Sequence, residues 1–193
     1  MKLRSFAVVA ALTFATLAAH AQTGIYLNPV AIRVGNSIDE GPFAFLGQDV
    51  TSRVFYGYTL GVYNDFYHSG KLSAGLDARL SDLHANNAML RSYLLGVRVT
   101  GSPFTRPIKP YAQISFGTGT TKAPASPVMI RKLDYVLYGG VDYTLHKHVD
   151  WRVGEIGYGQ VTTISSANIG GGGTLAVPAA NQISFSSGLV FRF

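Results

Sequence analysis

Hydrophobic and polar residues alternate one by one along several short stretches of the chain, and turn-forming residues separate these stretches. In residues 71–80, every second residue from Leu72 to Leu80 is leucine or alanine, and the residues between them are polar or glycine. A helix would scatter the charged side chains of this stretch around its circumference, whereas a strand places the two sets on opposite faces. The alternation therefore predicts an amphipathic β-strand.

Eight stretches alternate in this way, and we expect each of them to form one strand. They comprise residues 24–34, 53–62, 71–80, 92–99, 111–119 and 132–145, a stretch that begins at 149, and residues 183–193. In the seventh stretch Glu155 falls on the apolar side, so we expect a β-bulge near Gly154. An even number of strands in succession predicts an all-β fold, an eight-stranded antiparallel up-and-down transmembrane β-barrel.

The connections between these stretches alternate in length, as they do in a barrel with one rim of short turns and one rim of long loops. Short turns are expected at residues 68–70 and 146–148. The opposite rim should carry loops near residues 36–50, 82–88, 120–131 and 162–179. The connection 101–109 is longer than a tight turn and fits this scheme less well.

The final stretch separates an aromatic and aliphatic face from a small and polar face. The apolar face comprises Ile183, Phe185, Leu189, Phe191 and Phe193. Arg192 lies on the other face, in the lumen or at the rim. Such a strand needs hydrogen-bonded neighbours at both edges and an apolar environment on one side, and a closed barrel in lipid meets both requirements.

Alternation alone leaves two orientations open, because a secreted soluble barrel that binds an apolar ligand would show the same pattern with its apolar face inward. Two features favour an apolar face turned to lipid. The polar face is rich in Gly and Ser, and its charges are sparse and of both signs: Arg33, Arg53, Lys71, Asp77, Arg79, Arg98, Asp134, Asp142, Asp150 and Arg152. The apolar face carries aromatic residues that would form a girdle at the membrane surface: Tyr56, Tyr58, Tyr93, Tyr135, Tyr143 and Trp151.

Composition agrees with this orientation, since only 13% of the residues are charged, against about 25% in soluble domains. The formal charge of +6 is spread over the chain without a basic run, so nothing indicates nucleic-acid binding. The absence of cysteine excludes thiolate catalysis, Cys-ligated metals and a disulfide scaffold.

The first 21 residues have the features of a secretory signal peptide. A basic start with Lys2 and Arg4 precedes an uncharged apolar run, and Ala19-His20-Ala21 matches the cleavage pattern. The alternative, a retained membrane anchor, is disfavoured because the apolar run of roughly 15 residues is shorter than a spanning helix requires. We therefore expect an exported chain whose barrel domain covers residues 22–193.

Together, the signal peptide, the eight alternating stretches and a last stretch ending Gly188-Leu-Val-Phe-Arg-Phe193 resemble the small outer-membrane β-barrels of the OmpA/OmpX/opacity-protein group. The resemblance covers roughly residues 22–193, and its specific motif is the last strand. It implies insertion into outer-membrane lipid from the periplasm, assembly by the barrel-assembly machinery that reads the strand ending in Phe193, and no periplasmic domain after the barrel.

Two kinds of lipid-modifying enzyme share this architecture, and neither is favoured by the residues. A deacylase of this kind uses a His and a Ser two positions apart, whereas His68 and Ser69 are adjacent and point to opposite faces of a strand. An acyltransferase of this kind needs an amphipathic helix before the barrel, and residues 22–30 contain Pro29.

Other candidate sites have simpler explanations. His84 is expected in an outer loop, and His146 and His148 could share a metal but lack a third ligand. Residues 117–122 resemble a phosphate loop weakly and are interpreted as a strand end, because no strand–helix unit surrounds them. Residues 170–173 are four glycines in an expected surface loop. We therefore predict no catalytic, cofactor-binding or metal-binding residue.

The strongest candidates for a functional interior are the pairs Asp77–Arg79 and Asp150–Arg152. We interpret them as structural, because charges buried in a narrow eight-stranded barrel must pair, and these residues offer partners across neighbouring strands. The sequence thus predicts a monomeric, non-enzymatic outer-membrane barrel without a wide pore, with a structural role or an extracellular ligand bound by its outer loops. A lipid-modifying outer-membrane enzyme and a secreted soluble barrel are the alternatives.

Overall fold

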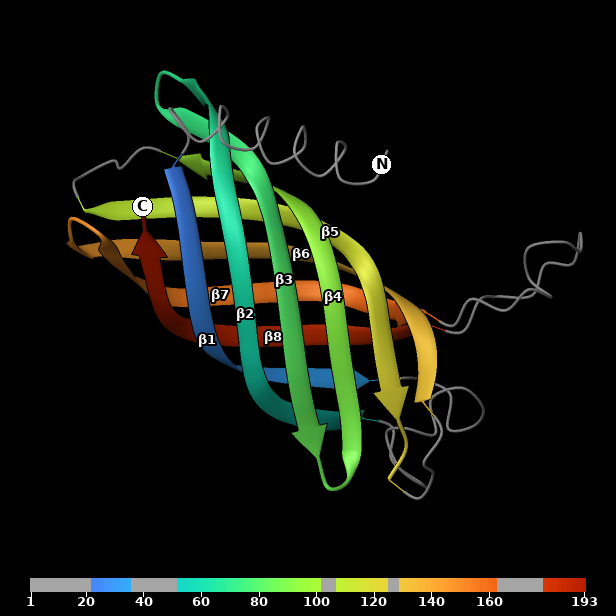
Figure 1. Ribbon diagram of the computed structural model, residues 1–193. Helices are drawn as coiled ribbons and strands as arrows, with labels where there is room; N and C mark the ends of the chain where they lie inside the picture. Colours follow the sequence, from blue (N-terminus) through green and yellow to red (C-terminus); the bar gives the residue numbers. More distant parts are fainter. Residues whose placement is uncertain (1–21, 36–51, 102–106, 125–128, 163–178) are drawn as a thin grey trace, which may run out of the picture.

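The computed structural model describes residues 22–35, 52–101, 107–124, 129–162 and 179–193. The expected signal peptide, the expected loop 36–50 and the glycines 170–173 lie outside these residues. The described residues form eight strands (Figure 1). The strands are β1 (Gln22–Gly35), β2 (Ser52–Ser69), β3 (Leu72–Ala85), β4 (Ala88–Gly101), β5 (Ile108–Lys122), β6 (Met129–His146), β7 (Val149–Thr162) and β8 (Ala179–Arg192).

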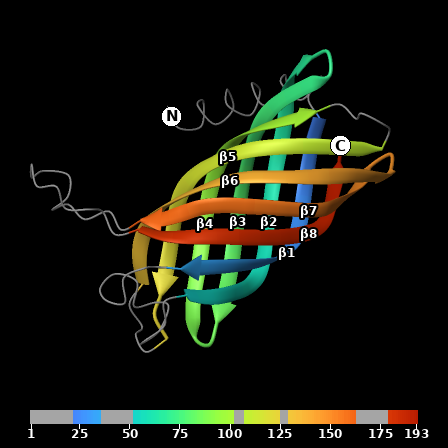
Figure 2. The same ribbon diagram turned by 180° about the vertical axis from the view of Figure 1, so that it is seen from behind.

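Each strand pairs antiparallel with the next, and β1 pairs with β8, so the sheet closes into a single barrel. Figure 2 shows the other side of the ring, where β5 to β8 cross in front of β2 to β4. The eight-stranded up-and-down architecture expected from the sequence is confirmed. Its two ends are named here the terminal rim, where β1 begins and β8 ends, and the far rim, where β1 ends and β8 begins.

Several connections differ from the expected ones. The expected outer loop 82–88 is wrong, because β3 and β4 extend to the far rim and meet in a two-residue turn at Asn86 and Asn87. Both asparagines have positive φ, 43° and 67°, a conformation that asparagine tolerates better than most residues and that tight hairpins require. The expected loop 120–131 is also shorter, since β5 reaches Lys122. The expected short turns lie at the terminal rim, with Gly70 at φ 58° in one of them.

The expected bulge near Gly154 is confirmed. The pairing of β7 with β8 shifts register between Arg152 and Glu155, so two residues of β7 oppose one of β8. The extra residue reverses the direction of every later side chain in β7. As a result Glu155, which the simple alternation placed on the apolar face, points into the barrel and is buried.

The outer surface of the barrel carries the aliphatic and aromatic side chains, many of them more than 40% exposed. From β2 to β8 the expected lipid-facing residues lie on this surface, among them Tyr56, Leu95, Leu137 and Phe185. All of the described strands together contribute an apolar outer belt that a water-soluble monomer would not expose. No helix long and apolar enough to cross a membrane occurs in the part of the chain that the structure describes.

In β1 the expected orientation is wrong. Val30, Ile32 and Val34 are buried, whereas Ile25 and Leu27 are exposed. The reason is that the barrel interior near the far rim is itself apolar, and β1 contributes to a cluster with side chains from other strands. This far-rim plug comprises Val30, Ile32, Val34, Phe55, Leu83, Ala88, Leu90 and Ala180.

Two of the expected lumen charges, Arg33 and Lys71, are also misplaced, whereas Arg53 shares the inward side of β2 with the buried Phe55. Arg33 lies on the exposed side of β1, because its neighbours Ile32 and Val34 take the interior positions. Lys71 is exposed in the turn between β2 and β3. Arg53 is half-buried at the far rim, where its Nη1 donates to the carbonyl oxygen of Ala85 at 3.3 Å.

Candidate functional site

Below the far-rim plug, the middle of the barrel contains six charged side chains that form one continuous network. Three are arginines and three are carboxylates, and all six are buried. They are Asp77 and Arg79 on β3, Arg98 on β4, Asp142 on β6, and Arg152 and Glu155 on β7. Their charges sum to zero, so the network needs no counterion from outside. We refer to it as the lumen network.

The first half of the lumen network centres on Arg79. Its Nε lies 3.1 Å from Oδ1 of Asp77 on the same strand. Its two terminal nitrogens donate to the two carboxylate oxygens of Glu155, at 3.0 and 3.2 Å. Gln113 bridges Arg79 and Asp77, because it accepts from Arg79 at 3.0 Å and donates to Asp77 at 2.7 Å. Bidentate, charge-assisted hydrogen bonds of this kind fix the relative orientation of the two groups and stabilise their opposite charges.

The second half centres on Asp142, which lies between two arginines. Arg152 donates from Nε to Oδ1 of Asp142 at 2.9 Å, and Arg98 donates from Nη2 to Oδ2 at 2.8 Å. Arg152 also reaches Glu155, with Nη1 3.4 Å from Oε2. This contact links the two halves, so the charges alternate in sign from Asp77 to Arg98. The cost of burying each charge is offset by two or more partners of opposite sign or by polar groups.

Four tyrosines fill the space between the guanidinium groups. Arg79 stacks over Tyr138 at 3.9 Å, and Arg98 lies 4.1 Å from the ring centres of both Tyr63 and Tyr111. Arg152 lies over Tyr26 at 4.3 Å. The hydroxyl of Tyr26 donates to Asp77 at 2.9 Å, and that of Tyr111 donates to Glu155 at 2.7 Å. The rings therefore shield the charges and also bond to them.

Glycines on the barrel wall make room for these rings. A Cβ at Gly61 would overlap the ring of Tyr26, and a Cβ at Gly140 would overlap the ring and hydroxyl of Tyr111. Both glycines belong to the polar, inward-facing set that the sequence identified. Each glycine is the cross-strand partner of its tyrosine on the neighbouring strand. It lets the ring lie flat across that strand, because a larger residue would push the ring into the network.

Between the plug and the network lies a smaller polar group. Ser92 donates to Asp134 at 2.5 Å, and Gln182 donates to the other oxygen of Asp134. At the terminal rim, Asp150 lies 3.1 Å from Lys109 and 2.7 Å from Arg192. The four residues that the sequence singled out for the interior, Asp77, Arg79, Asp150 and Arg152, are all buried, and Asp77 also contacts Arg79. Asp150 does not pair with Arg152, because Arg152 turns toward Asp142 and Glu155 instead.

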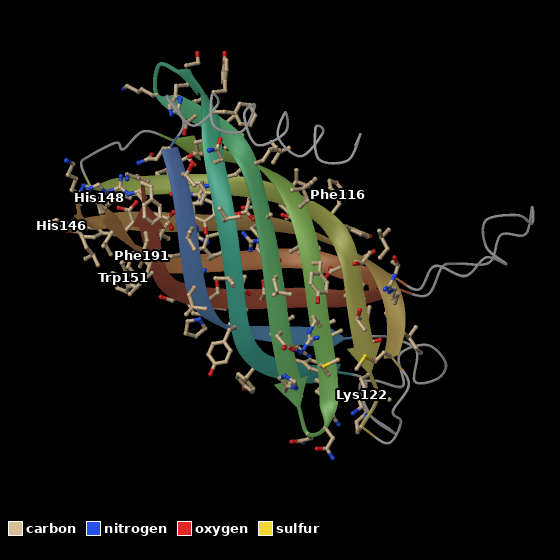
Figure 3. The ribbon with its side chains drawn as sticks, in the orientation of Figure 1. Phe116, Lys122, His146, His148, Trp151 and Phe191 are labelled. Carbon is tan, nitrogen blue, oxygen red and sulfur yellow. The ribbon has the colours of Figure 1, made fainter. Side chains whose placement is uncertain are left out.

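The histidines do not form a site among the described residues. His68 and Ser69 end β2 and are exposed at the terminal rim. His84 lies in β3 and not in a loop, with Nε2 3.3 Å from Asp82 on the outside of the barrel. His146 and His148 lie at the terminal rim (Figure 3), where Nδ1 of His148 is 3.1 Å from the carbonyl oxygen of Arg192. No group of three metal-ligating side chains occurs within the described ranges.

Sequence reasoning missed Glu155 and the four stacked tyrosines. The signal for Glu155 was the broken alternation at the bulge, because one extra residue turns into the barrel an acid that simple alternation places toward lipid. Residues 117–122, which resemble a phosphate loop, form the end of β5 as expected.

A closed antiparallel ring with an apolar outside and a charged, filled inside defines the class: an eight-stranded β-barrel of the transmembrane type. More particularly, the fold is that of the small outer-membrane barrels. The chain is similar to the Neisserial surface protein A, with 15% identity, 89% of this chain and 97% of that one covered, and a TM-score of 0.53. It is similar to Ail of Yersinia pestis, solved with the heparin analogue sucrose octasulfate, with 9% identity, 90% and 99% covered, and a TM-score of 0.52.

At these identities the likeness extends to the fold. No family model matches the chain, and no curated protein matches it. The resemblance to the OmpA/OmpX/opacity-protein group is thus confirmed at the level of architecture, and the function has to be argued from the residues of this chain.

Proposed function

We propose that the chain is a monomeric integral protein of the bacterial outer membrane with a structural or surface-interaction role, without a wide pore and without catalytic activity. The observation that carries the proposal is the lumen network: six charged side chains and four tyrosines occupy the cross-section that a channel would need. A narrow eight-stranded barrel is typically filled by its own side chains.

The membrane location is supported by the apolar outer belt, which would be costly to expose to water. In this arrangement residues 1–21 act as the signal peptide, the far rim faces outside, and any extracellular ligand binds through the connections at that rim. The barrel-assembly machinery would recognise β8, whose outward face carries Phe191 and ends beside the exposed Phe193.

The absence of catalysis is supported by the placement of the candidate residues. His68 and Ser69 are successive residues at the end of a strand, so the imidazole and the hydroxyl diverge. The carboxylates of the lumen network are all held by arginines, which leaves them no free role as a base.

Electrical recording tests the proposal. The chain would be extracted from membranes, checked for heat-modifiable gel migration, and inserted into planar lipid bilayers beside a 16-stranded porin. We expect heat-modifiable migration and no current steps of porin size. Porin-sized steps would contradict the closed lumen, and recovery from the periplasm without detergent would contradict the membrane location. Lipid A acyl chains compared by mass spectrometry with and without the chain should be identical, and a changed pattern would contradict the non-enzymatic role.

A further inference from the structure

Three cations gather on the outside of the barrel next to the far rim. Arg91, Lys122 and Arg131 lie on the neighbouring strands β4, β5 and β6. Each lies an even number of positions from lipid-facing residues of its own strand, such as Tyr93 and Phe116, and therefore points outward. Figure 3 shows Lys122 near the far-rim end of β5, beyond Phe116.

The register places these cations directly above the apolar belt. Arg91 pairs with Thr120, and Thr120 pairs with Arg131, so the three residues form one row across the sheet. Lys122 belongs to the next row toward the rim. In the row on the other side of Arg91, Tyr93 pairs with Thr118, and Thr118 pairs with Leu133. The outer surface thus changes from apolar to cationic within one row, about 7 Å along a strand.

The positive charge of this face is only partly neutralised. Arg91 donates to Asp82 on β3 at 2.7 Å, and both side chains are more than one-third exposed. Lys122 and Arg131 form no ion pair with a described residue. On the other side of the ring Arg33 is exposed on β1. The outward positions of the two preceding strands are neutral there, since Gln160 of β7 donates its amide to Asn181 of β8 at 2.9 Å.

The spacing suits a phosphorylated headgroup. Neighbouring strands are about 4.8 Å apart, so the backbones of Arg91 and Arg131 are roughly 10 Å apart, with Thr120 between the two cations. Long cationic side chains from both edges can converge on phosphate oxygens, and guanidinium groups bind them in a bidentate manner. Two rows below the cations, Leu95 and Phe116 are a cross-strand pair, both more than half exposed, and would contact acyl chains.

We propose that this face of β4, β5 and β6 binds one phosphorylated lipid of the outer leaflet, with Arg91, Lys122 and Arg131 on its phosphate groups and the belt below along its acyl chains. The inference rests on the proposed function, since it requires insertion with the far rim outward. Thr118 and Thr120 supply hydroxyl donors to the same headgroup. The lipid would be bound as a fixed part of the protein surface at one side of the ring.

The test measures lipid binding to the folded barrel in phosphatidylcholine nanodiscs. Lipid A with both phosphates is titrated by fluorescence, with dephosphorylated lipid A as the second ligand. We expect tighter binding of the phosphorylated lipid, weakening with salt. The triple variant Arg91→Gln/Lys122→Gln/Arg131→Gln should lose roughly a hundredfold in affinity, because each cation near an anionic lipid surface contributes about fivefold.

A second triple variant, Arg33→Gln/Lys71→Gln/Lys147→Gln, removes the same charge from other parts of the barrel and should stay within about twofold of the unmodified chain. Equal losses in both variants, or no preference for the phosphorylated lipid, would overturn the site. If the triple variant does not fold, the single variant Arg131→Gln is measured instead, and its affinity for the phosphorylated lipid should fall about fivefold. Failure of the unmodified chain to insert would instead overturn the proposed function, and heat-modifiable migration separates the two cases.

Discussion

Arg79 and Glu155 join opposite walls of the barrel. Arg79 lies on β3 and Glu155 on β7, four strands away in a ring of eight, and two hydrogen bonds of 3.0 and 3.2 Å connect the guanidinium to the carboxylate. The pair therefore spans the lumen at its middle. Every other member of the lumen network contacts one of these two residues or Asp142.

Glu155→Gln should destabilise the barrel strongly. The substitution leaves Arg79 and Arg152 with one carboxylate partner each, and an uncompensated buried charge costs roughly 3–5 kcal/mol. The urea midpoint of the folded barrel in detergent measures the loss. Asp82→Asn, which breaks an exposed ion pair with Arg91, is the matched control and should change stability by no more than about 1 kcal/mol. Similar midpoints for the two variants would refute the central role of Glu155.

Gly61→Ala should distort the network, because its methyl group would overlap the ring of Tyr26. We expect a loss of about 1–3 kcal/mol, as for other overpacked sites. Gly139→Ala provides the control, since a Cβ at that exposed position meets nothing within 4 Å. Thermal unfolding followed by circular dichroism compares the two, and an unchanged Gly61→Ala midpoint would contradict the tight packing of Tyr26.

Deletion of Phe193 should impair assembly and cause periplasmic accumulation. The residue is 75% exposed on the outside of the barrel, and its backbone N–H bonds to the carbonyl oxygen of Thr23 at 2.9 Å. Outer-membrane yield on fractionation is the measurement. Phe116→Ala, also lipid-facing but in the middle of β5, should retain normal yield. Normal yield of the deletion variant would argue against recognition through the last strand.

Replacing Arg79 and Glu155 together by alanine should raise ion conductance. The double variant keeps the lumen neutral but removes the side chains that cross its middle, so water and ions gain space. Planar bilayer recordings at equal protein density compare it with Asp82→Ala/Arg91→Ala, which removes an ion pair outside the barrel. Currents that are equal in the two variants would show that another layer, such as the far-rim plug, closes the lumen.

The strands could be predicted because a barrel wall imposes a period of two on polarity, and β3 shows it from Leu72 to Leu80. The orientation of β1 could not, since Val30, Ile32 and Val34 satisfy the same alternation while facing an apolar plug. Apolar residues are expected on a strand whether it faces an apolar barrel interior or lipid, so the residue types do not distinguish the two. The turn at Asn86 and Asn87 was mistaken for a loop because its tightness depends on two positive φ angles.

Within the site, the sequence identified most of the buried charges but not which of them pair with one another. Alternation determines whether a side chain points into the barrel or out of it. Which side chains meet across the lumen depends on the register stagger between strands of the closed barrel. Asp150 and Arg152 are neighbours in sequence and belong to different ion pairs. The broken alternation at Glu155 predicted the bulge, but the expected interior charges did not include Glu155 itself, which the extra residue turns into the lumen.

The division of charges between the strands has a consequence for how the barrel can form. In β1 to β5 the lumen network contributes Asp77, Arg79 and Arg98, an excess of one positive charge, and in β6 to β8 it contributes Asp142, Arg152 and Glu155, an excess of one negative charge. A half-formed sheet in lipid would hold an unpaired ion in each part, at a cost of several kcal/mol per ion. Closure of the ring and entry into the hydrocarbon layer are therefore expected to occur as one cooperative event, with no stable open intermediate.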